Sequence, residues 1–367
     1  MKDMRFFLRV TSFCLLIGVV CAQSALPEDS NRLLLENKTV LVFGGTGYLG
    51  RSIVEEALKY SPKKVIIFSR DEVKHFNVQN LFKDSRVDCV IGDIRDYESV
   101  VRATRGVDIA FHVAALKRMD ALEYNAEEGI KTNILGSMNV FNACVANGVK
   151  KVLFVSTDKA CLPVNIYGAS KFAAEKVFTN YDRTKIATQC VAVRFGNILE
   201  STGSIIPIFL EKIKKGEALT LTDERMTRFI IDKKLAVELM FDALRYSVGG
   251  EIFIRRLPSM NIADLIQVLK IGVKADNPVK ITGIRPGEKL HEVLINRPEM
   301  ARAIEFKGYF VIRPSIAKND DPCDTQADYM QHGTPVTGAF AEIEYSSDLA
   351  VVSRDVLTQY FKELGIL

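Results

Sequence analysis

Short apolar runs and amphipathic stretches alternate along the first half of the chain. The runs that predict buried strands lie at residues 39–43, 65–68, 89–91, 107–113, 152–155 and 191–195. Between them, residues 52–60 and 127–147 carry apolar side chains at the spacing of an amphipathic helix. Strands that alternate with helices form parallel sheets with both faces covered. We therefore predict an α/β fold built on a doubly wound, Rossmann-type parallel sheet.

The pattern changes after about residue 200. Helices are predicted at 205–215, 232–247 and 261–270, and a polar surface loop at 319–337. This change favours a smaller lobe that closes over the edge of the sheet. We divide the chain into a leader at 1–25, a Rossmann domain at 38–200 to which later segments return, and a C-terminal lobe that occupies most of 201–367.

Composition narrows the class of protein. The 367 residues, 48% of them hydrophobic, suffice for one or two domains with a sizeable core. The net charge of +4 comes from 49 basic and 45 acidic residues that are dispersed along the chain. Since no basic run is interleaved with aromatic residues, nucleic-acid binding is not expected. The seven cysteines form no Cys-x-x-Cys pair, so no metal site is predicted.

The first residues have the pattern of a secretory signal peptide. Lys2, Arg5 and Arg9 precede an apolar run at 13–22, and small residues follow it. The run is short for a membrane span, and an upstream extension or a membrane-associating leader is the alternative. Cysteines in apolar contexts suit a reducing compartment instead. We expect a cytoplasmic protein, with secretion or membrane attachment through the leader as the alternative.

A glycine-rich turn follows the first predicted strand. Gly44, Gly47 and Gly50 have the spacing G-x-x-G-x-x-G between a strand and a helix. Glycines at these positions let the backbone approach a pyrophosphate, and the helix N-terminus stabilises its charge. We predict a dinucleotide site. Its expected residues are Gly44, Thr46, Gly47, Tyr48, Leu49, Gly50, Ser69, Arg70, Lys74, Asp93, Ile94, Ala114, Ala115, Lys117, Tyr167 and Lys171.

The end of the second strand indicates which dinucleotide binds. An acidic residue there would bind a ribose hydroxyl, whereas an arginine accommodates a 2′-phosphate. This chain has Arg70, with Lys74 close behind, and we predict NADP. Asp71 leaves NAD open, and a solvated loop charge is the structural alternative for Arg70.

Acid–base chemistry is predicted after the fifth strand. Asp158 and Lys159 follow that strand directly, and Tyr167 and Lys171 share a face of the next helix. A nearby ammonium lowers the pKa of a tyrosine, which could then take a proton from a sugar hydroxyl. The alternatives are a turn cap for Asp158 and a solvated loop position for Lys159.

These motifs resemble the extended short-chain dehydrogenase/reductase superfamily. More narrowly, the chain is similar to the nucleotide-sugar 4,6-dehydratases, and most of all to the inverting UDP-N-acetylglucosamine 4,6-dehydratases that start pseudaminic acid synthesis. Besides the motifs above, the resemblance rests on residues 69–72, 131–133, 156–160, 194–197, 226–229, 285–292 and 345–348. It runs from about Lys38 to the C-terminus. Members of the retaining, membrane-bound branch usually lack a tyrosine at the position of Tyr167. The departures from the family pattern are Phe43, Thr202 and Ile230.

The resemblance implies a reaction and roles for its residues. The substrate would be UDP-N-acetylglucosamine, which loses water between C5 and C6 with inversion at C5. The implied catalytic residues are Thr157, which holds sugar hydroxyls, Asp158 as the acid at C6, Lys159 as the base at C5, Tyr167 as the base at the C4 hydroxyl, and Lys171. The implied substrate-binding residues are Lys117, Arg194, Asn197, Arg228, Arg285 and Glu288, and a structural ion pair is the alternative for each charged member from Arg194 onward. The family also implies a homo-oligomer and a product used for surface glycans.

Two other functions fit parts of the sequence. A UDP-sugar 4-epimerase would use Tyr167 and Lys171, but it would not need Asp158 and Lys159. A non-catalytic NADP-binding protein would fit the leader and the three departures.

Overall fold

The structure of the protein is a computed structural model in which residues 28–199, 201, 203–316 and 327–367 are described. The predicted leader at 1–25 and Thr202 lie outside the described residues. In the described part of the chain, no helix combines the length and the hydropathy that a membrane span requires.

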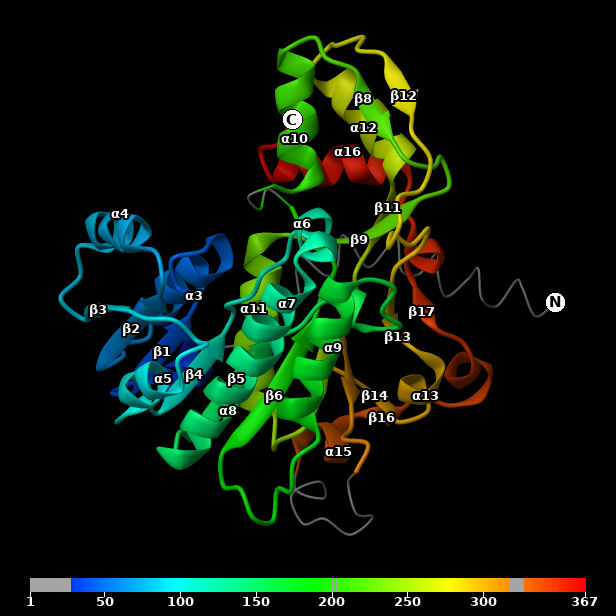
Figure 1. Cartoon of the computed structure of the whole chain (residues 1–367). Coiled ribbons are helices and arrows are strands. Elements are labelled where there is room, and N and C mark those ends of the chain that lie inside the picture. The colour runs from blue at the N-terminus through cyan, green and yellow to red at the C-terminus, as the bar shows by residue number, and fades with distance from the viewer. Residues whose placement is uncertain (1–27, 200, 202, 317–326) are drawn as a thin grey trace.

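A ten-stranded sheet forms the centre of the molecule (Figure 1). Its order is β16-β14-β15-β10-β6-β5-β4-β1-β2-β3. The strands from one edge to the other are β16 (Thr334–Pro335), β14 (Ala303–Phe306), β15 (Tyr309–Ile312), β10 (Ile252–Arg255), β6 (Gln189–Arg194), β5 (Lys151–Val155), β4 (Ile109–His112), β1 (Thr39–Phe43), β2 (Lys64–Ser69) and β3 (Val87–Ile91). From β3 to β10 all neighbours are parallel. The order β3-β2-β1-β4-β5-β6 is that of a Rossmann sheet, so the predicted fold class is confirmed.

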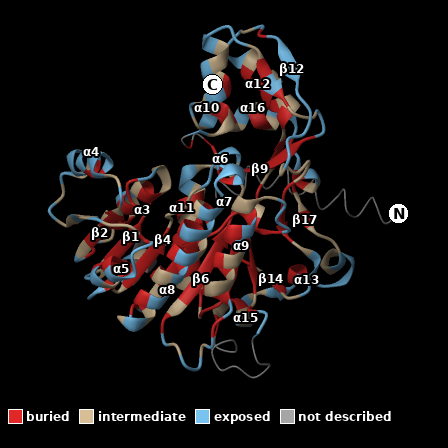
Figure 2. Ribbon diagram, viewed as in Figure 1, coloured by how far each residue is buried: buried red, intermediate tan, exposed pale blue. Residues whose placement is uncertain are grey.

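Helices cover the parallel strands, which explains why the strands read as continuous apolar runs. The helices around the sheet are α2 (Glu28–Leu35), α3 (Tyr48–Leu58), α4 (Glu72–Phe82), α5 (Tyr97–Thr104), α8 (Gly136–Ala146), α9 (Ile166–Thr179) and α11 (Lys233–Tyr246). The neighbours α5, α8 and α9 pack in a row, and α3 packs against α11. Figure 2 shows the strands buried beneath these layers; Val40 and Val42 of β1, for example, are fully buried.

Three antiparallel strands extend the sheet beyond the predicted parallel part. β15 pairs antiparallel with β10, β14 pairs with β15, and β16 pairs with β14. The sequence pattern did not predict these strands. It was also wrong about residues 319–337 as a loop throughout, because the described part of that range contains α15 (Asp328–His332) and β16.

The smaller lobe has its own hydrophobic core. It contains α10 (Ile205–Lys214), α12 (Ile262–Gly272), α16 (Arg354–Glu363) and the two-stranded sheet of β8 (Leu219–Leu221) and β12 (Val279–Ile281). Leu219, Ile266 and Phe361 are among its buried members. Figure 1 shows this lobe above the carboxyl ends of the parallel strands.

Short elements connect the lobe to the main sheet. β7 (Asn197–Ile198), β9 (Thr227–Ile231) and β11 (Ser259–Asn261) form one small sheet, and β13 (Val293–Ile295) pairs with β17 (Tyr345–Ser346). The remaining elements are α6 (Met119–Tyr124), α7 (Ala126–Gly129), the π-helix η1 (Ile130–Leu135), the 3-10 helix η2 (Asp158–Ala160), α13 (Arg297–Met300), η3 (Gly338–Glu342) and η4 (Ser347–Ala350). η2, which follows β5, lies against β13. This contact brings the predicted catalytic residues to the junction of the two parts.

Candidate active site

The glycine turn joins β1 to α3 at the switch point between β1 and β4. Gly44 has φ +84°, and a Cβ there would lie 2.8 Å from the backbone nitrogen of Ala114. Gly47 precedes α3 and has no side chain to compete for the amides of its first turn. The turn is therefore a cradle that fits a pyrophosphate at a helix N-terminus.

Side chains that follow β1 and β2 are joined by hydrogen bonds. The Thr46 hydroxyl donates to Ser69 Oγ at 3.0 Å, and Ser69 Oγ lies 3.0 Å from His75 Nε2. His75 is 3% exposed and fixes the end of β2 from within α4. Sequence reasoning missed His75, because a single histidine on a helix carries no motif.

The basic residues expected at a 2′-phosphate lie at the surface beside acidic partners. Arg70 Nη1 is 3.5 Å from Asp93 Oδ2, and Lys74 Nζ is 3.1 Å from Asp71 Oδ2. Asp71 also caps α4 by accepting from the Lys74 backbone at 3.0 Å. Ile94 is buried. Because both basic residues lie beside acidic partners, the contacts do not distinguish NADP from NAD, and NADP stays a prediction.

The loop after β4 is tied to the helix that carries Tyr167. In η1, Asn133 accepts from the Leu116 backbone at 2.8 Å and donates to the Leu116 carbonyl at 2.9 Å. It also donates to Ser170 Oγ at 2.9 Å, and Ser170 donates to the Tyr167 carbonyl. The predicted continuous helix at 127–147 is in fact interrupted by this π-helical turn, a feature frequent at functional sites. Asn133 thus couples the predicted cofactor loop at 114–117 to the acid–base residues.

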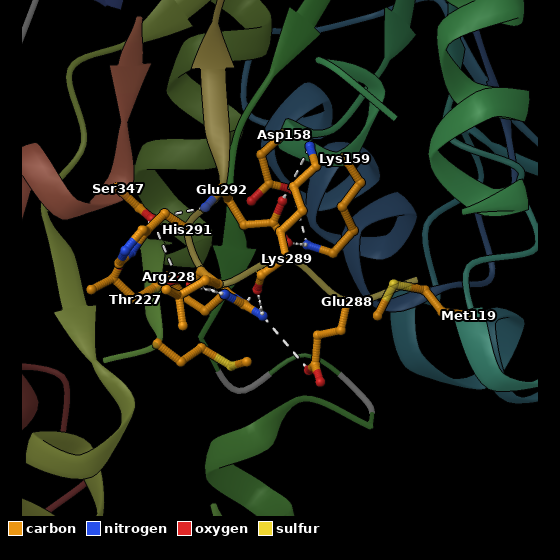
Figure 3. A network of polar contacts seen from close by, with 12 residues as sticks. Met119, Asp158, Lys159, Thr227, Arg228, Glu288, Lys289, His291, Glu292 and Ser347 are labelled. Atoms are coloured by element: carbon orange, nitrogen blue, oxygen red, sulfur yellow. Dashed lines mark hydrogen bonds and ion pairs between the residues drawn. The ribbon is translucent and has the colours of Figure 1, made fainter. Parts of the chain in front are cut away.

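The predicted acid and base lie together at the end of β5. Asp158 is fully buried, and its Oδ1 accepts from the Thr157 hydroxyl at 2.9 Å and from Lys159 Nζ at 3.1 Å. Lys159 Nζ also lies 3.2 Å from Glu292 Oε1 (Figure 3). Asp158 therefore forms a buried ion pair, and Lys159 is not a solvated loop lysine.

Close backbone packing brings Tyr167 to this loop. A Cβ on Gly168 would lie 2.3 Å from the Lys159 carbonyl oxygen, so only glycine permits the approach of α9 to η2. Asn165 caps α9 by accepting from the Gly168 backbone at 2.7 Å. Thr157, Asp158 and Lys159 all act on the pKa of the Tyr167 phenol, and η2 packs closely against α9. Thr157, Asp158, Lys159 and Tyr167 thus form one connected group.

Lys171, on the same helix as Tyr167, contacts an aromatic ring of β5. Its Nζ is 3.9 Å from the centre of the Phe154 ring. Burial raises the pKa of Tyr167, and the cation that opposes this increase is Lys159. Lys171 is not among the groups that act on this pKa, and its role in tuning Tyr167 stays a prediction. Burial lowers the pKa of Lys171 itself to about 7, and Glu175 opposes that shift.

This buried lysine gives a stability prediction. Below pH 7 Lys171 is charged in both the folded and the unfolded protein, so the full cost of burying the ammonium is present. Between pH 7 and its ordinary pKa of 10.5, the unfolded protein binds more protons and the folded protein gains relative stability as pH rises. We expect Lys171→Met to stabilise the fold by about 1–3 kcal/mol at pH 6, with the gain gone above about pH 10.5. Urea unfolding at the two pH values measures it.

The matched control is Lys176→Met at a half-buried position of the same helix, which should not reproduce the stabilisation at pH 6. If the gain from Lys171→Met were the same at both pH values, the low pKa of Lys171 would be refuted.

Three of the predicted substrate residues meet at the lobe junction. Arg228 Nη2 is 3.6 Å from Glu288 Oε1, and Arg285 Nη2 is 3.0 Å from the same oxygen. Arg228 is almost fully buried and also donates to the carbonyls of Thr227, Lys289 and Leu290, whereas Arg285 is exposed. Asn197 is half-buried and Lys117 is exposed.

Arg194 is not part of this site. It is completely buried, and its guanidinium donates to both carboxylate oxygens of Glu175, at 2.5 and 2.7 Å, and to both of Glu299, each at 2.7 Å. The guanidinium also donates to the Leu294 carbonyl at 3.0 Å, so all of its N–H donors have partners within the protein. The predicted role in binding the uridine diphosphate is wrong, and the structural ion pair is correct.

Two of the family departures lie in the core. Phe43 is fully buried and makes edge contacts with Phe68 and His112. Ile230, in β9, is fully buried in the core of the smaller lobe.

Comparison with known proteins gives consistent matches over most of the chain. The sequence profile of the polysaccharide biosynthesis protein family matches residues 40–314. The chain is 41% identical over 320 residues to the UDP-N-acetylglucosamine 4,6-dehydratase (inverting) of Campylobacter jejuni, over 86% of this chain and 94% of the relative. It is 38% identical over 282 residues to the UDP-glucose 4-epimerase of Rickettsia massiliae, over 75% of this chain and 83% of the relative.

Solved structures share the architecture. Pen from Bacillus thuringiensis superposes with a TM-score of 0.83 at 35% identity, over 91% of this chain and 99% of the other. The dTDP-glucose 4,6-dehydratase DesIV from Streptomyces venezuelae, solved with NAD and TYD bound, gives a TM-score of 0.63 at 25% identity, over 69% and 86%.

Proposed function

The chain belongs to the polysaccharide biosynthesis protein family, and from this premise we propose that it is an inverting UDP-N-acetylglucosamine 4,6-dehydratase. The observation that carries the proposal is the buried Asp158–Lys159 pair beside Tyr167. Loss of water from a sugar requires an acid and a base close together, in addition to the base that acts at the C4 hydroxyl. The 41% identity to the Campylobacter jejuni enzyme supports the same assignment.

We propose NADP as the cofactor, held by the glycine turn and by the residues after β2, β3 and β4. Arg70 and Lys74 would bind the 2′-phosphate. DesIV was solved with NAD, which makes NAD the alternative. When bound, this cofactor would supply an acceptor for the hydride of C4 and a donor of hydride to C6.

The side chains of this site would divide the proton transfers. Tyr167 would take the proton of the C4 hydroxyl, and Lys159 would remove the proton from C5, which the C4 ketone makes acidic. Asp158 would protonate the departing C6 hydroxyl, which leaves as water. Thr157 would hold the sugar hydroxyls in a reactive geometry. Protonation of C5 from the opposite face would then give the UDP 6-deoxy-4-keto L-sugar.

The nucleotide would lie at the junction of the lobe and the sheet. Arg228 and Arg285 suit a diphosphate because the guanidinium fork matches phosphate oxygens. Lys117, Asn197 and Glu288 would complete the binding site. We further propose a homo-oligomer in the cytoplasm whose product enters pseudaminic-acid-type or other surface glycan synthesis.

Incubation with UDP-N-acetylglucosamine, followed by NMR, tests the activity. The expected product is a 6-deoxy-4-keto sugar. If purified protein with bound cofactor yields none, the assignment as a dehydratase is refuted.

The 4-epimerase is the second candidate, favoured by the 38% identity to the Rickettsia massiliae enzyme. In heavy water, a dehydratase incorporates deuterium at C5, whereas an epimerase leaves C5 unlabelled. Cofactor binding without turnover of any UDP-sugar would instead indicate a non-catalytic binding protein.

Close packing at Gly168 gives a prediction about rate. Gly168→Ala would push η2 away from α9, because the new Cβ would lie 2.3 Å from the Lys159 carbonyl oxygen. A displacement of about 1 Å in a catalytic group lowers turnover about 100-fold, and we expect a loss of that order in steady-state dehydration. Ala169→Ser, on an exposed neighbour, is the control. Normal turnover by Gly168→Ala would show that the spacing is not required.

A further inference from the structure

Glu292 is a buried carboxylate at the centre of the polar network in Figure 3. It directly precedes β13 and is 3% exposed. Its Oε1 lies 3.2 Å from Lys159 Nζ and 3.8 Å from Arg228 Nε, and its Oε2 lies 3.8 Å from Lys289 Nζ. It thus contacts the proposed C5 base directly, although the family resemblance assigned it no role.

The backbone around Glu292 is fixed by hydrogen bonds. Its N–H donates to Ser347 Oγ at 2.9 Å, and its carbonyl accepts from the Ser347 backbone at 2.8 Å. Ser347 Oγ lies 2.6 Å from Thr227 Oγ1, which in turn lies 2.8 Å from His291 Nδ1. These contacts join β13, η4 and β9, so the carboxylate has a defined position opposite η2.

Lys159 therefore lies between two carboxylates. Burial alone would lower its pKa, but Asp158 and Glu292 together raise it well above its usual range, against the opposing effect of Arg228. The resting lysine is an ammonium. A base at C5 must be the neutral amine, so Lys159 must pass one proton to a neighbour before it can act.

The two carboxylates are not equivalent acceptors. Burial favours the neutral acid for Glu292, but Lys159, Arg228 and Lys289 hold its pKa below the usual value. For Asp158, burial raises the pKa and the charge of Glu292 raises it further, while Lys159 opposes both. Asp158 Oδ2 and Glu292 Oε2 are both buried without a hydrogen-bond partner in the described structure, so the difference between the two carboxylates comes from the charges around them. Of the neighbouring titratable groups, Tyr167 on α9 interacts with Lys159 and Asp158, Glu288 pairs with Arg228, and His291 contacts Thr227.

We propose that Glu292 is a positioning residue that holds Lys159 Nζ beside Asp158 and directs the proton of Lys159 to Asp158. This inference rests on the proposed dehydratase function. Arg228 and Lys289 keep Glu292 ionised. The negative charge of Glu292 makes a second ionised carboxylate beside it unfavourable. Asp158 then carries the proton, and Glu292 keeps the neutral amine in place.

The proton balance closes over the elimination. One proton moves from Lys159 Nζ to Asp158 Oδ1, which gives a neutral amine and a neutral acid. The amine then takes the C5 proton, the electron pair of that bond forms the C5–C6 double bond, and the C6–O bond breaks. Asp158 gives its proton to the departing hydroxyl, which leaves as water. Lys159 ends as an ammonium and Asp158 as a carboxylate, which is the resting ion pair.

Titration of the Asp158 carboxyl by ¹³C NMR, without substrate, tests the inference. The resonance is assigned by its loss in Asp158→Asn. In Glu292→Gln the like charge is removed, and we expect the titration midpoint of Asp158 to fall by about 1–3 pH units. Glu292→Asp, which keeps the charge, should restore most of the wild-type midpoint. Glu224→Gln, at an exposed position of the same lobe, should leave it unchanged.

Catalysis supplies the second measurement. Glu292→Gln should slow deuterium exchange at C5 by at least about tenfold, part of the effect expected for loss of an acid–base group. An unchanged Asp158 midpoint together with normal exchange in Glu292→Gln would overturn the inference. If Glu292→Gln does not fold, Lys289→Met takes its place. It should raise the midpoint of Glu292 and lower that of Asp158, and unmoved midpoints there would overturn the inference equally.

The two proposals fail separately. If the midpoint shifts as expected but no 6-deoxy-4-keto sugar forms, the dehydratase assignment fails and the influence of Glu292 on Asp158 stands. If the product forms and Glu292→Gln changes neither measurement, only the inference about Glu292 fails.

Discussion

Tyr167→Phe is expected to lower turnover of UDP-N-acetylglucosamine by about 100-fold to 10,000-fold, because the C4 hydroxyl then has no proton acceptor. Burial raises the pKa of the phenol, and the Lys159 ammonium opposes that rise. The variant keeps the ring and loses only the hydroxyl. Absorbance at the reduced-nicotinamide wavelength, followed during a single turnover, should therefore show no transient.

Tyr124→Phe is the matched control, because Tyr124 is 92% exposed on α6. It should show the wild-type transient and rate. A normal transient in Tyr167→Phe would mean that another group takes the C4 proton.

Lys159→Ala is expected to stop the reaction one step later. C5 then lacks a base, so water is not lost, and turnover should fall by about 100-fold to 10,000-fold. The absorbance of reduced nicotinamide should accumulate. It should rise more slowly than in the wild type, because Lys159 is also the cation that opposes the raised pKa of Tyr167. C5 should remain unlabelled in heavy water.

Lys185→Ala, a change at an exposed lysine, is the control for this variant. Water loss at the normal rate in Lys159→Ala would show that Lys159 is not the base. The two variants together therefore separate C4 proton removal from C5 proton removal.

The sheet and the glycine turn could be predicted because their signals are local. The run at 39–43 is apolar throughout, and β1 occupies those residues with both faces covered. Gly44, Gly47 and Gly50 follow that run directly at a regular spacing. Asp158, Lys159 and Tyr167 are close in sequence, so their strand and helix already bring them together.

What the sequence did not reveal depends on distant partners. The family resemblance assigned Arg194 to the diphosphate, but Glu175 and Glu299 come from other elements and enclose it. Lys171 shares a helix face with Tyr167, but that spacing did not reveal the contact of its ammonium with the Phe154 ring. Glu292 belongs to a motif typical of the family, but only the packing of β13 against η2 brings it to Lys159.

The ends of the ten-stranded sheet differ in how readily another chain could extend them. β16 is the outermost strand at one end, has two residues, and finishes at Pro335, which has no N–H to donate. Very short edge strands and edge prolines discourage edge-to-edge aggregation. At the other end, β3 is five residues long, and its last residue, Ile91, is 59% exposed. Self-association by strand addition, as in a misassembled or partly unfolded preparation, should therefore start at β3, and charged substitutions there are the rational way to improve solubility.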